Sequence, residues 1–289
     1  LRYTAENVHD FAWFADKRFH VLKGEVLLPS GKKVDTWAMF TNHQADLWTQ
    51  AVDYINRAVK SYSEWVGEYP WPHATAVQSA LSAGAGMEYP MITVIGNAAS
   101  PKDLDQVITH EVGHNWFYGI LATNERDHAW MDEGINSFYE YRYTTLFWGS
   151  RVVEALPAFI SSSTDADLYE LAYLYTARRR LDQAPDTPSD DFEMVNYGTA
   201  SYIKTGSAFR HLEAWLGREQ FDAAMQAYFR QWQFRHPYPE DLKAVLEANT
   251  GKDLNWFFDG YLFSNAHYDY AFGAADRKNG KWLLTLCNK

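Results

Sequence analysis

The feature that most constrains the fold is a change of sequence pattern at Pro101. Before this residue, short segments have the composition of strands, and one stretch at about 44–66 places its apolar residues at helical spacing. From Pro101 to about Phe263 the helical spacing prevails. Strands followed by helices predict an α+β fold, in which a sheet-containing lobe packs on an all-helical lobe with a cleft between them.

The individual elements follow from the same patterns and from their flanking turn residues. Strands are expected within residues 26–40, 74–81 and 91–96, and the clearest helices at 44–66, 101–119, 131–147, 200–216, 219–234 and 239–250. Residues 268–272 and 282–286 have the pattern of strands again, which indicates that a new unit begins there.

Composition narrows the class of protein. The net charge of −11 argues against a sequence-independent nucleic-acid binder, because such proteins need a basic surface. No apolar run approaches the length of a membrane span, and the single cysteine, Cys287, excludes an internal disulfide. The chain of 289 residues starts at Leu1 without a signal-peptide pattern. We therefore expect a processed form or a piece of a longer chain, and the sequence leaves localisation open.

The most specific motif is His110-Glu111-Val112-Gly113-His114, within the helix expected at 101–119. Residues four apart lie on one helix face, about 6 Å apart along the axis. Two imidazoles at this spacing can bind one Zn²⁺, and Glu111 is offset around the helix, where a general base can reach a zinc-bound water. Two surface histidines are the alternative interpretation, which a third ligand would weaken.

Glu133 supplies that third ligand. It follows His114 after 18 intervening residues, which is enough for a loop and the start of a second helix. Two histidines and a glutamate with an open fourth position are typical of catalytic zinc, whereas structural zinc sites use mostly cysteine. The sequence therefore predicts one catalytic Zn²⁺ per chain, bound by His110, His114 and Glu133.

Glu140 lies seven residues after Glu133, on the same face of the expected helix. It is placed to accept a hydrogen bond from the far nitrogen of a ligand histidine, although a surface carboxylate explains its position equally well. His128 lacks a partner at helical spacing and is interpreted as a non-ligand.

At these residues the chain resembles the M1 family of zinc aminopeptidases, which belongs to the gluzincins. The first matching segment is the motif of residues 110–114 with Glu133 at the family's spacing, which implies the same zinc ligands and makes Glu111 the base. The second is Ala85-Gly86-Met87-Glu88-Tyr89, which is similar to the family's Gly-x-Met-Glu-Asn strand. The third is Tyr202-Ile203-Lys204, which is similar to the family's Tyr-x-Lys segment.

The resemblance also implies how a peptide would be held. Glu88 would bind the free α-amino group, with Ala85 and Gly86 presenting their backbone to the peptide. Tyr202 would form a hydrogen bond to the tetrahedral oxyanion. Tyr197 is the competing tyrosine, but only Tyr202 has a lysine two residues later.

The implied activity is zinc-dependent hydrolysis of the N-terminal peptide bond of peptides that have a free N-terminus. A thermolysin-type zinc endopeptidase is an alternative that the segment around Glu88 argues against. A non-catalytic scaffold is a second alternative, which intact Glu111 and the complete ligand set argue against. An epoxide hydrolase on the same scaffold would share these motifs and stays open. Among the departures from the family pattern, Asp132 replaces an asparagine before the zinc glutamate.

The resemblance implies a thermolysin-like zincin catalytic domain at residues 15–263, with an N-terminal mixed β-sheet lobe at about 15–119 and a C-terminal helical lobe at about 120–263. Residues 1–14 are similar to the family's exit from an N-terminal β domain, and residues 264–289 would begin a following β unit. The expected partners are therefore a peptide substrate and other domains of a longer chain.

Overall fold

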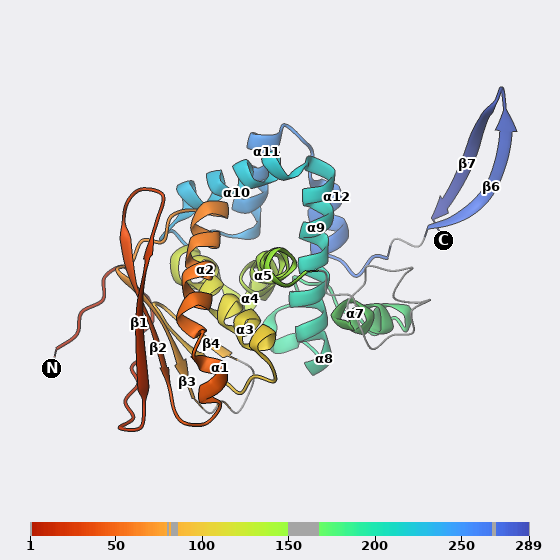
Figure 1. Ribbon diagram of the computed structural model, residues 1–289. Coiled ribbons are helices and arrows are strands. Elements are labelled where there is room, and N and C mark those ends of the chain that lie inside the picture. Colours follow the sequence, from red (N-terminus) through yellow and green to blue (C-terminus); the bar gives the residue numbers. More distant parts are fainter. Residues whose placement is uncertain (1, 80, 82–85, 150–167, 268–269, 289) are drawn as a thin grey trace.

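The computed structural model describes residues 2–79, 81, 86–149, 168–267 and 270–288. Apart from one C-terminal hairpin, the described strands precede Pro101, and helices form nearly all the remaining described secondary structure (Figure 1). The predicted α+β class is therefore confirmed. Ala85, which was expected to present its backbone to a peptide, lies outside the described residues.

A five-stranded mixed sheet forms the N-terminal part. Its strands are β1 (His20–Leu27), β2 (Lys33–Phe40), β3 (His73–Gln78), β4 (Gly86–Tyr89) and β5 (Ile92–Ile95), in the spatial order β1-β2-β3-β5-β4. The three inner strands are parallel, whereas β1 and β4 run antiparallel to their neighbours at the two edges. The strand that carries Glu88 is therefore an edge strand of this sheet.

Strand β1 starts at His20, six residues before the expected strand at Val26. Most of its residues are exposed or only partly buried, because it is an edge strand. A strand with little burial lacks the alternation of apolar and polar residues on which a sequence prediction depends. Strand β2, which alternates regularly between buried and partly exposed residues, agrees with the prediction.

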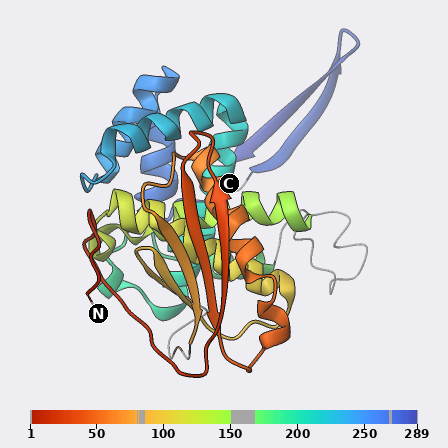
Figure 2. The ribbon, with the colours of Figure 1, turned by 60° about the vertical axis from the view of Figure 1, so that its left-hand side comes forward.

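Helices α1 (Ala45–Trp48), α2 (Ala51–Trp65) and α3 (Pro101–His114) lie on one face of the sheet (Figures 1 and 2). α3 begins at a defined cap, because the Ser100 hydroxyl accepts a hydrogen bond from the backbone N–H of Asp103 and Pro101 occupies the first turn. The metal motif therefore lies at the end of a helix whose start and register are fixed by the sequence.

The helical part surrounds α5 (Glu133–Trp148), which is seen nearly end-on at the centre of Figure 1. Before it come the π-helix η1 (Asn115–Leu121), α4 (Glu125–His128) and η2 (Ala129–Met131). After it come α7 (Leu168–Arg178), η3 (Ser189–Asp191), α8 (Met194–Asn196), the π-helix η4 (Tyr197–Lys204), α9 (Thr205–Leu216), α10 (Arg218–Trp232), α11 (Pro239–Thr250), α12 (Asn255–Phe257) and η5 (Phe258–Leu262).

Several predicted helices are divided in the structure. The helix expected at 101–119 is α3 followed by η1, and the helix expected at 200–216 is the end of η4 followed by α9. Hydrophobic spacing does not distinguish α-helical from π-helical turns, because both bury one side of the segment. No helix in the described ranges has both the length and the apolarity needed to cross a membrane.

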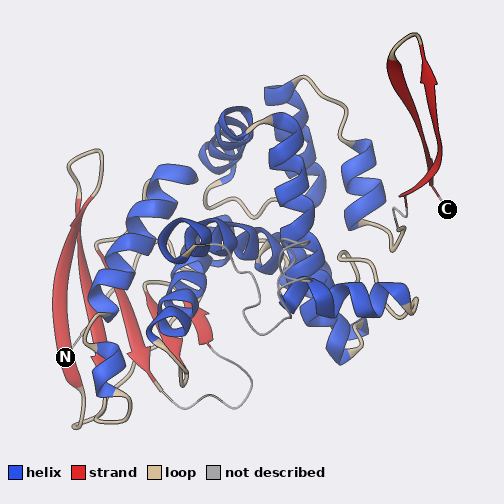
Figure 3. Ribbon diagram, turned by 45° about the vertical axis from the view of Figure 1, so that its right-hand side comes forward, coloured by secondary structure: helices blue, strands red, loops and turns tan. Residues whose placement is uncertain are grey.

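Strands β6 (Tyr270–Lys278) and β7 (Lys281–Asn288) form an antiparallel hairpin that projects away from the helices (Figures 1 and 3). Its large apolar side chains are exposed; Phe272 is 76% and Trp282 is 66% accessible. The strand pattern at the end of the sequence is thus confirmed for the residues that the structure describes.

A close contact of α2, α3 and α5 positions the metal motif. The Tyr62 hydroxyl donates to Oδ1 of Asn136 at 2.8 Å, and Nδ2 of Asn136 donates to the carbonyl of His110 at 2.7 Å. A Cβ atom on Gly113 would lie 2.1 Å from Asn136 Oδ1 and 2.4 Å from the Tyr62 hydroxyl oxygen. Glycine at this position therefore lets the three helices approach closely.

We expect Gly113→Ala to lower the free energy of unfolding by about 1–3 kcal/mol, because the added methyl group forces the three helices apart. Denaturant unfolding followed by circular dichroism measures this. Gly206→Ala is the matched control, because its Cβ would meet the nearest atoms at an ordinary 3.5 Å. That variant should be unchanged or up to about 1 kcal/mol more stable, from the better helix propensity of alanine. Equal effects of the two substitutions would contradict the packing argument.

Candidate metal centre

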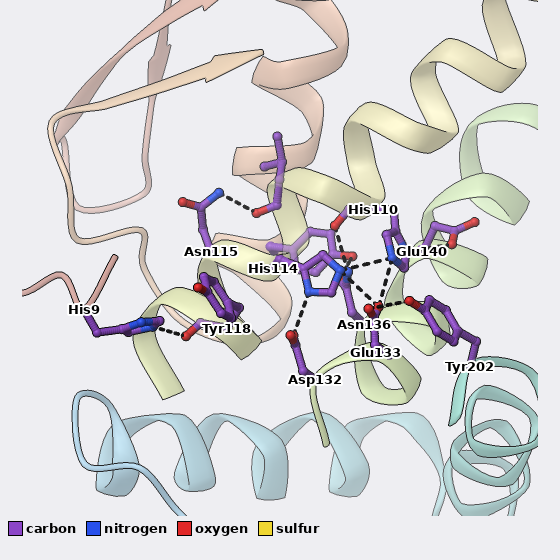
Figure 4. Close-up of polar contacts among 12 residues, drawn as sticks. His9, His110, His114, Asn115, Tyr118, Asp132, Glu133, Asn136, Glu140 and Tyr202 are labelled. Atoms are coloured by element: carbon purple, nitrogen blue, oxygen red, sulfur yellow. Dashed lines mark hydrogen bonds and ion pairs between the residues drawn. The ribbon is translucent and has the colours of Figure 1, made fainter. Parts of the chain in front are cut away.

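Three side chains from α3 and α5 converge on one point (Figure 4). The Nε2 atoms of His110 and His114 lie 3.1 Å apart, and Oε2 of Glu133 lies 3.3 Å from the first and 3.2 Å from the second. Ligands at about 2.0–2.1 Å from a tetrahedral zinc ion are separated by roughly 3.3 Å. The three atoms therefore have the mutual spacing of three corners of a zinc tetrahedron.

The positions of the protons on the two imidazole rings are also compatible with a bound metal. Nδ1 of His110 lies 3.1 Å from Oε2 of Glu140, and Nδ1 of His114 lies 2.6 Å from Oδ1 of Asp132. An ionised carboxylate only accepts hydrogen bonds, so each Nδ1 carries the proton and each Nε2 presents a lone pair. Oε2 of Glu133 is buried without a hydrogen-bond partner among the described residues. Converging lone pairs of nitrogen and oxygen suit Zn²⁺.

Charges around the centre favour a bound cation. Burial alone would raise the pKa of Glu133, but His114 and His110 outweigh it and hold the pKa below the ordinary value, so this carboxylate is ionised. Burial likewise opposes protonation of His110, yet the hydrogen bonds with Glu133 and Glu140 raise its pKa to about 10. Carboxylates and positive charge thus stabilise each other at this centre, where a bound cation could take the place of the protons on the imidazoles.

Glu111 lies beside the three converging atoms but is not one of them. Its side chain is buried, and Oε2 has no hydrogen-bond partner within the described part of the chain. A Cβ atom on Gly86 of β4 would lie 2.1 Å from Oε1 of Glu111, so the absence of a side chain there makes room for this carboxylate. Burial raises the pKa of Glu111 to about 8. A proton affinity near neutral pH suits a general base.

Glu88 and Tyr202 approach different residues of the centre. A carboxylate oxygen of Glu88 lies within 4.8 Å of ligand-type atoms of both Glu111 and His114. The Tyr202 hydroxyl donates a hydrogen bond to Oε1 of Glu133, and its ring stacks on the His110 ring at 6.0 Å. Burial raises the pKa of Tyr202 well above its ordinary value, so it remains a hydrogen-bond donor. Tyr197 packs edge-on against Tyr202, with 5.7 Å between the ring centres.

A cavity of about 380 Å³ adjoins the centre on the side of Tyr202. Its lining includes His110, Glu111 and Tyr202 and continues to Gly206 and Arg210 on α9. The candidate base and the candidate oxyanion donor thus share one cavity with a metal ligand, as a reacting substrate requires.

Asp132 is the functional position that the sequence argument undervalued. It was noted only as a replacement for asparagine, yet it is fully buried and holds Nδ1 of His114. Its position directly before Glu133, at the start of α5, is the signal that could have indicated this contact. Glu140, in contrast, lies against Nδ1 of His110, where the helical spacing placed it.

The model of the peptidase family M1 domain matches residues 50–261. This match contains the whole candidate metal centre. The chain belongs to peptidase family M1. Its M1 assignment agrees with the resemblance carried by the motif of residues 110–114, Glu133 and the segments around Glu88 and Tyr202.

The curated relatives that this chain matches have low sequence identity to it and are much longer than it is. Aminopeptidase M1-D of Oryza sativa subsp. japonica is 25% identical over 217 residues, which cover 71% of this chain and 24% of the relative. Aminopeptidase N of Streptomyces lividans is 25% identical over 238 residues, which cover 79% of this chain and 26% of the relative. The chain thus spans about a quarter of the length of these relatives.

Solved structures of an aminopeptidase and of an M1 zinc metallopeptidase share the fold. Legionella pneumophila aminopeptidase A, in complex with aspartic acid, superposes with a TM-score of 0.68 at 15% identity, over 85% of this chain and 28% of its own. A mutant M1 zinc metallopeptidase of Deinococcus radiodurans, bound to a Tyr-Ser-Ala substrate, gives a TM-score of 0.63 at 15% identity, over 84% of this chain and 52% of its own. The mixed sheet followed by a helical part is therefore the fold that these structures share with this chain.

We expect Asp132→Ala to weaken zinc binding about 10- to 100-fold, because the partner that orients His114 and keeps its proton on Nδ1 is lost. Competition with a chromogenic chelator measures the zinc affinity. Asp132→Asn keeps the side-chain volume and should lie between the alanine variant and the parent chain. Asp127→Ala removes an exposed carboxylate on nearby α4 and should leave the affinity unchanged. Parent-like zinc binding by both Asp132 variants would refute the positioning role.

Proposed function

We propose that this chain carries the catalytic centre of a zinc aminopeptidase, which hydrolyses the N-terminal peptide bond of peptides with a free N-terminus. The observation that carries the proposal is the convergence of His110, His114 and Glu133, with a free carboxylate of Glu111 beside them. A structural zinc site would close the fourth position with a protein ligand. We also propose that residues 15–263 form the catalytic domain, which contains the M1 match at 50–261.

His110, His114 and Glu133 would hold the zinc, which when bound supplies a Lewis acid and lowers the pKa of water toward about 7. Glu140 and Asp132 keep the two imidazoles in the tautomer that binds a metal. These contacts would hold both imidazoles in the orientation that a metal needs.

Glu111 acts as the general base. It accepts the proton of the attacking water and then transfers it to the nitrogen of the leaving amine. Its carboxylate is fixed over Gly86, so attack and protonation take place beside the same strand. Tyr202 donates its hydroxyl proton in a hydrogen bond to the oxygen of the scissile carbonyl as negative charge develops there.

The edge strand β4 and Glu88 support exopeptidase action. An edge strand offers unpaired backbone groups to an extended peptide, which can bind as an additional strand. A peptide aligned along β4 would bring its ammonium group to Glu88, close to the reacting carbonyl. The endopeptidase alternative would require a chain to continue past this carboxylate, which would then be left without its cation.

The proposed activity is tested by measuring the hydrolysis of a panel of aminoacyl fluorophore amides by the parent chain and by the variant Glu111→Gln. The parent chain should hydrolyse substrates with a free amine, and a chelator should abolish this activity. Glu111→Gln should retain zinc by elemental analysis but lose about 10²- to 10⁴-fold in kcat, because glutamine cannot take the proton.

Three results would contradict these assignments. Full activity of Glu111→Gln would show that Glu111 is not the general base. Equal hydrolysis of N-acetylated and free substrates would favour an endopeptidase. Zinc binding without hydrolysis of any amide would favour a non-catalytic scaffold. If the same chain opened an epoxide, the result would favour an epoxide hydrolase.

Tyr202→Phe tests the oxyanion donor. Loss of one such donor should lower kcat by about 10²- to 10³-fold with little change in KM, because the hydrogen bond strengthens only in the transition state. Steady-state kinetics measures both constants. Tyr197→Phe is the matched control in the same π-helix and should retain kcat; the reverse pattern would reassign the role to Tyr197.

A further inference from the structure

Lys204 is a buried cation that the proposed mechanism does not use. It is the last residue of η4, two residues after Tyr202, and is only 3% accessible. Its Nζ donates a hydrogen bond to the carbonyl of Ser264 at 2.9 Å and lies 6.0 Å from the centre of the Tyr173 ring on α7. Burial lowers the pKa of Lys204 to about 8, although the charge of Asp182 opposes this shift. A lysine is almost never buried so deeply unless it is paired, so its contacts indicate what it holds in place.

Lys204 and Tyr202 lie on opposite sides of η4. Residues two apart in a helix are separated by about half a turn around its axis. Tyr202 faces the metal centre, where its hydroxyl donates to Glu133 and its side chain lines the cavity (Figure 4). Lys204 reaches Ser264 instead and is not among the described residues that line this cavity. An effect of Lys204 on a substrate in the cavity must therefore pass through η4.

The contact at Ser264 belongs to a segment that is itself fixed. Residues 264–267 lead from η5 toward the hairpin of β6 and β7. The Ser264 hydroxyl donates to the carbonyl of Gly260 at 3.0 Å, and Nε2 of His267 lies 2.9 Å from Oδ2 of the buried Asp182. Both ends of the segment are thus anchored, so the Ser264 carbonyl is a fixed point for the lysine.

Contacts with two neighbouring segments hold η4 in place. π-helical turns are uncommon and short, and they occur frequently at functional sites. The start of α5 approaches η4 closely because Gly134 has no side chain; a Cβ atom there would lie 2.4 Å from the carbonyl oxygen of Ser201. Lys204 adds the contact with residues 264–267. The position of η4 is therefore set by α5 and by this segment together.

We propose that Lys204 is a positioning residue, which holds η4 against residues 264–267 and thereby fixes the Tyr202 hydroxyl for its contact with the oxyanion. The inference rests on the proposed function, because it takes Tyr202 as the oxyanion donor. A misplacement of about 1 Å, even when caused far from the reacting atoms, can lower a rate by about 10²-fold. A contact on the far side of η4 can thus affect kcat without touching the substrate.

A double-mutant cycle in steady-state kinetics tests this role. Lys204→Met removes the donor but keeps an unbranched side chain, and it should lower kcat about 10- to 100-fold with little change in KM or zinc affinity. In the background of Tyr202→Phe, the same substitution should lower kcat less than about 2-fold, because the hydroxyl that Lys204 positions is already absent. Lys204→Arg keeps a cationic donor and should retain more of kcat than Lys204→Met.

Hydrogen exchange followed by mass spectrometry tests the anchoring of η4 without turnover. In the zinc-loaded Lys204→Met chain, the amides of residues 197–204 should exchange at least about 10-fold faster, whereas those of residues 101–114 should keep their protection. Lys60→Met is the matched control, because it removes an exposed lysine from α2; it should change neither the exchange nor kcat.

The outcomes separate this inference from the proposed function. An equal loss of kcat with and without the Tyr202 hydroxyl shows that Lys204 does not act through it and overturns the positioning role. Unchanged exchange at residues 197–204 overturns it as well. Faster exchange throughout the chain, or a loss of zinc, assigns Lys204 to the stability of the whole fold and also overturns it. If the parent chain hydrolyses no amide, the proposed function fails, and selectively faster exchange at residues 197–204 still supports the anchoring of η4 by Lys204.

Discussion

The candidate metal centre depends on one constraint: the fold must hold two imidazole nitrogens and one carboxylate oxygen close together. The Nε2 atoms of His110 and His114 and the Oε2 atom of Glu133 lie 3.1–3.3 Å apart, and all three would face one another as acceptors unless a proton or a metal ion lies between them. Such an arrangement is unfavourable in itself, so the fold must impose it. The cap at Ser100 and the contact of Asn136 with the carbonyl of His110 are part of this constraint.

Two glycines, Gly86 and Gly134, are as important for the geometry of the centre as the residues that would bind the metal. Without a Cβ atom at Gly86, the Glu111 carboxylate can lie against β4. A Cβ atom on Gly134 would lie 2.3 Å from Cγ2 of Thr205 and 2.4 Å from the carbonyl oxygen of Ser201. This glycine lets η4 approach the start of α5, which brings Tyr202 to Glu133. Two close backbone approaches thus position the proposed base, Glu111, and the proposed oxyanion donor, Tyr202.

The convergence of His110, His114 and Glu133 could be predicted from the sequence because two constraints coincide in it. Helical spacing fixes His110 relative to His114, and the motif is specific enough to identify Glu133 across a loop. Helical spacing also placed Glu140 on the correct face of α5. The contact of Asp132 with His114 could not be derived in this way, because it depends on the turn between η2 and α5. The approach of Glu125 to Glu88 could not be derived either, since no periodic pattern relates α4 to β4.

Asp132 connects the metal centre to the neighbouring group of carboxylates. One of its oxygens accepts the proton of His114, and its carboxylate also approaches Glu88 and Glu125. An asparagine at this position would hold the imidazole through its carbonyl oxygen but would bring an amide, and no charge, to these carboxylates. Burial raises the pKa of Asp132 to about 6, while His114 opposes that rise, so the contact with the imidazole offsets the cost of burying this carboxylate.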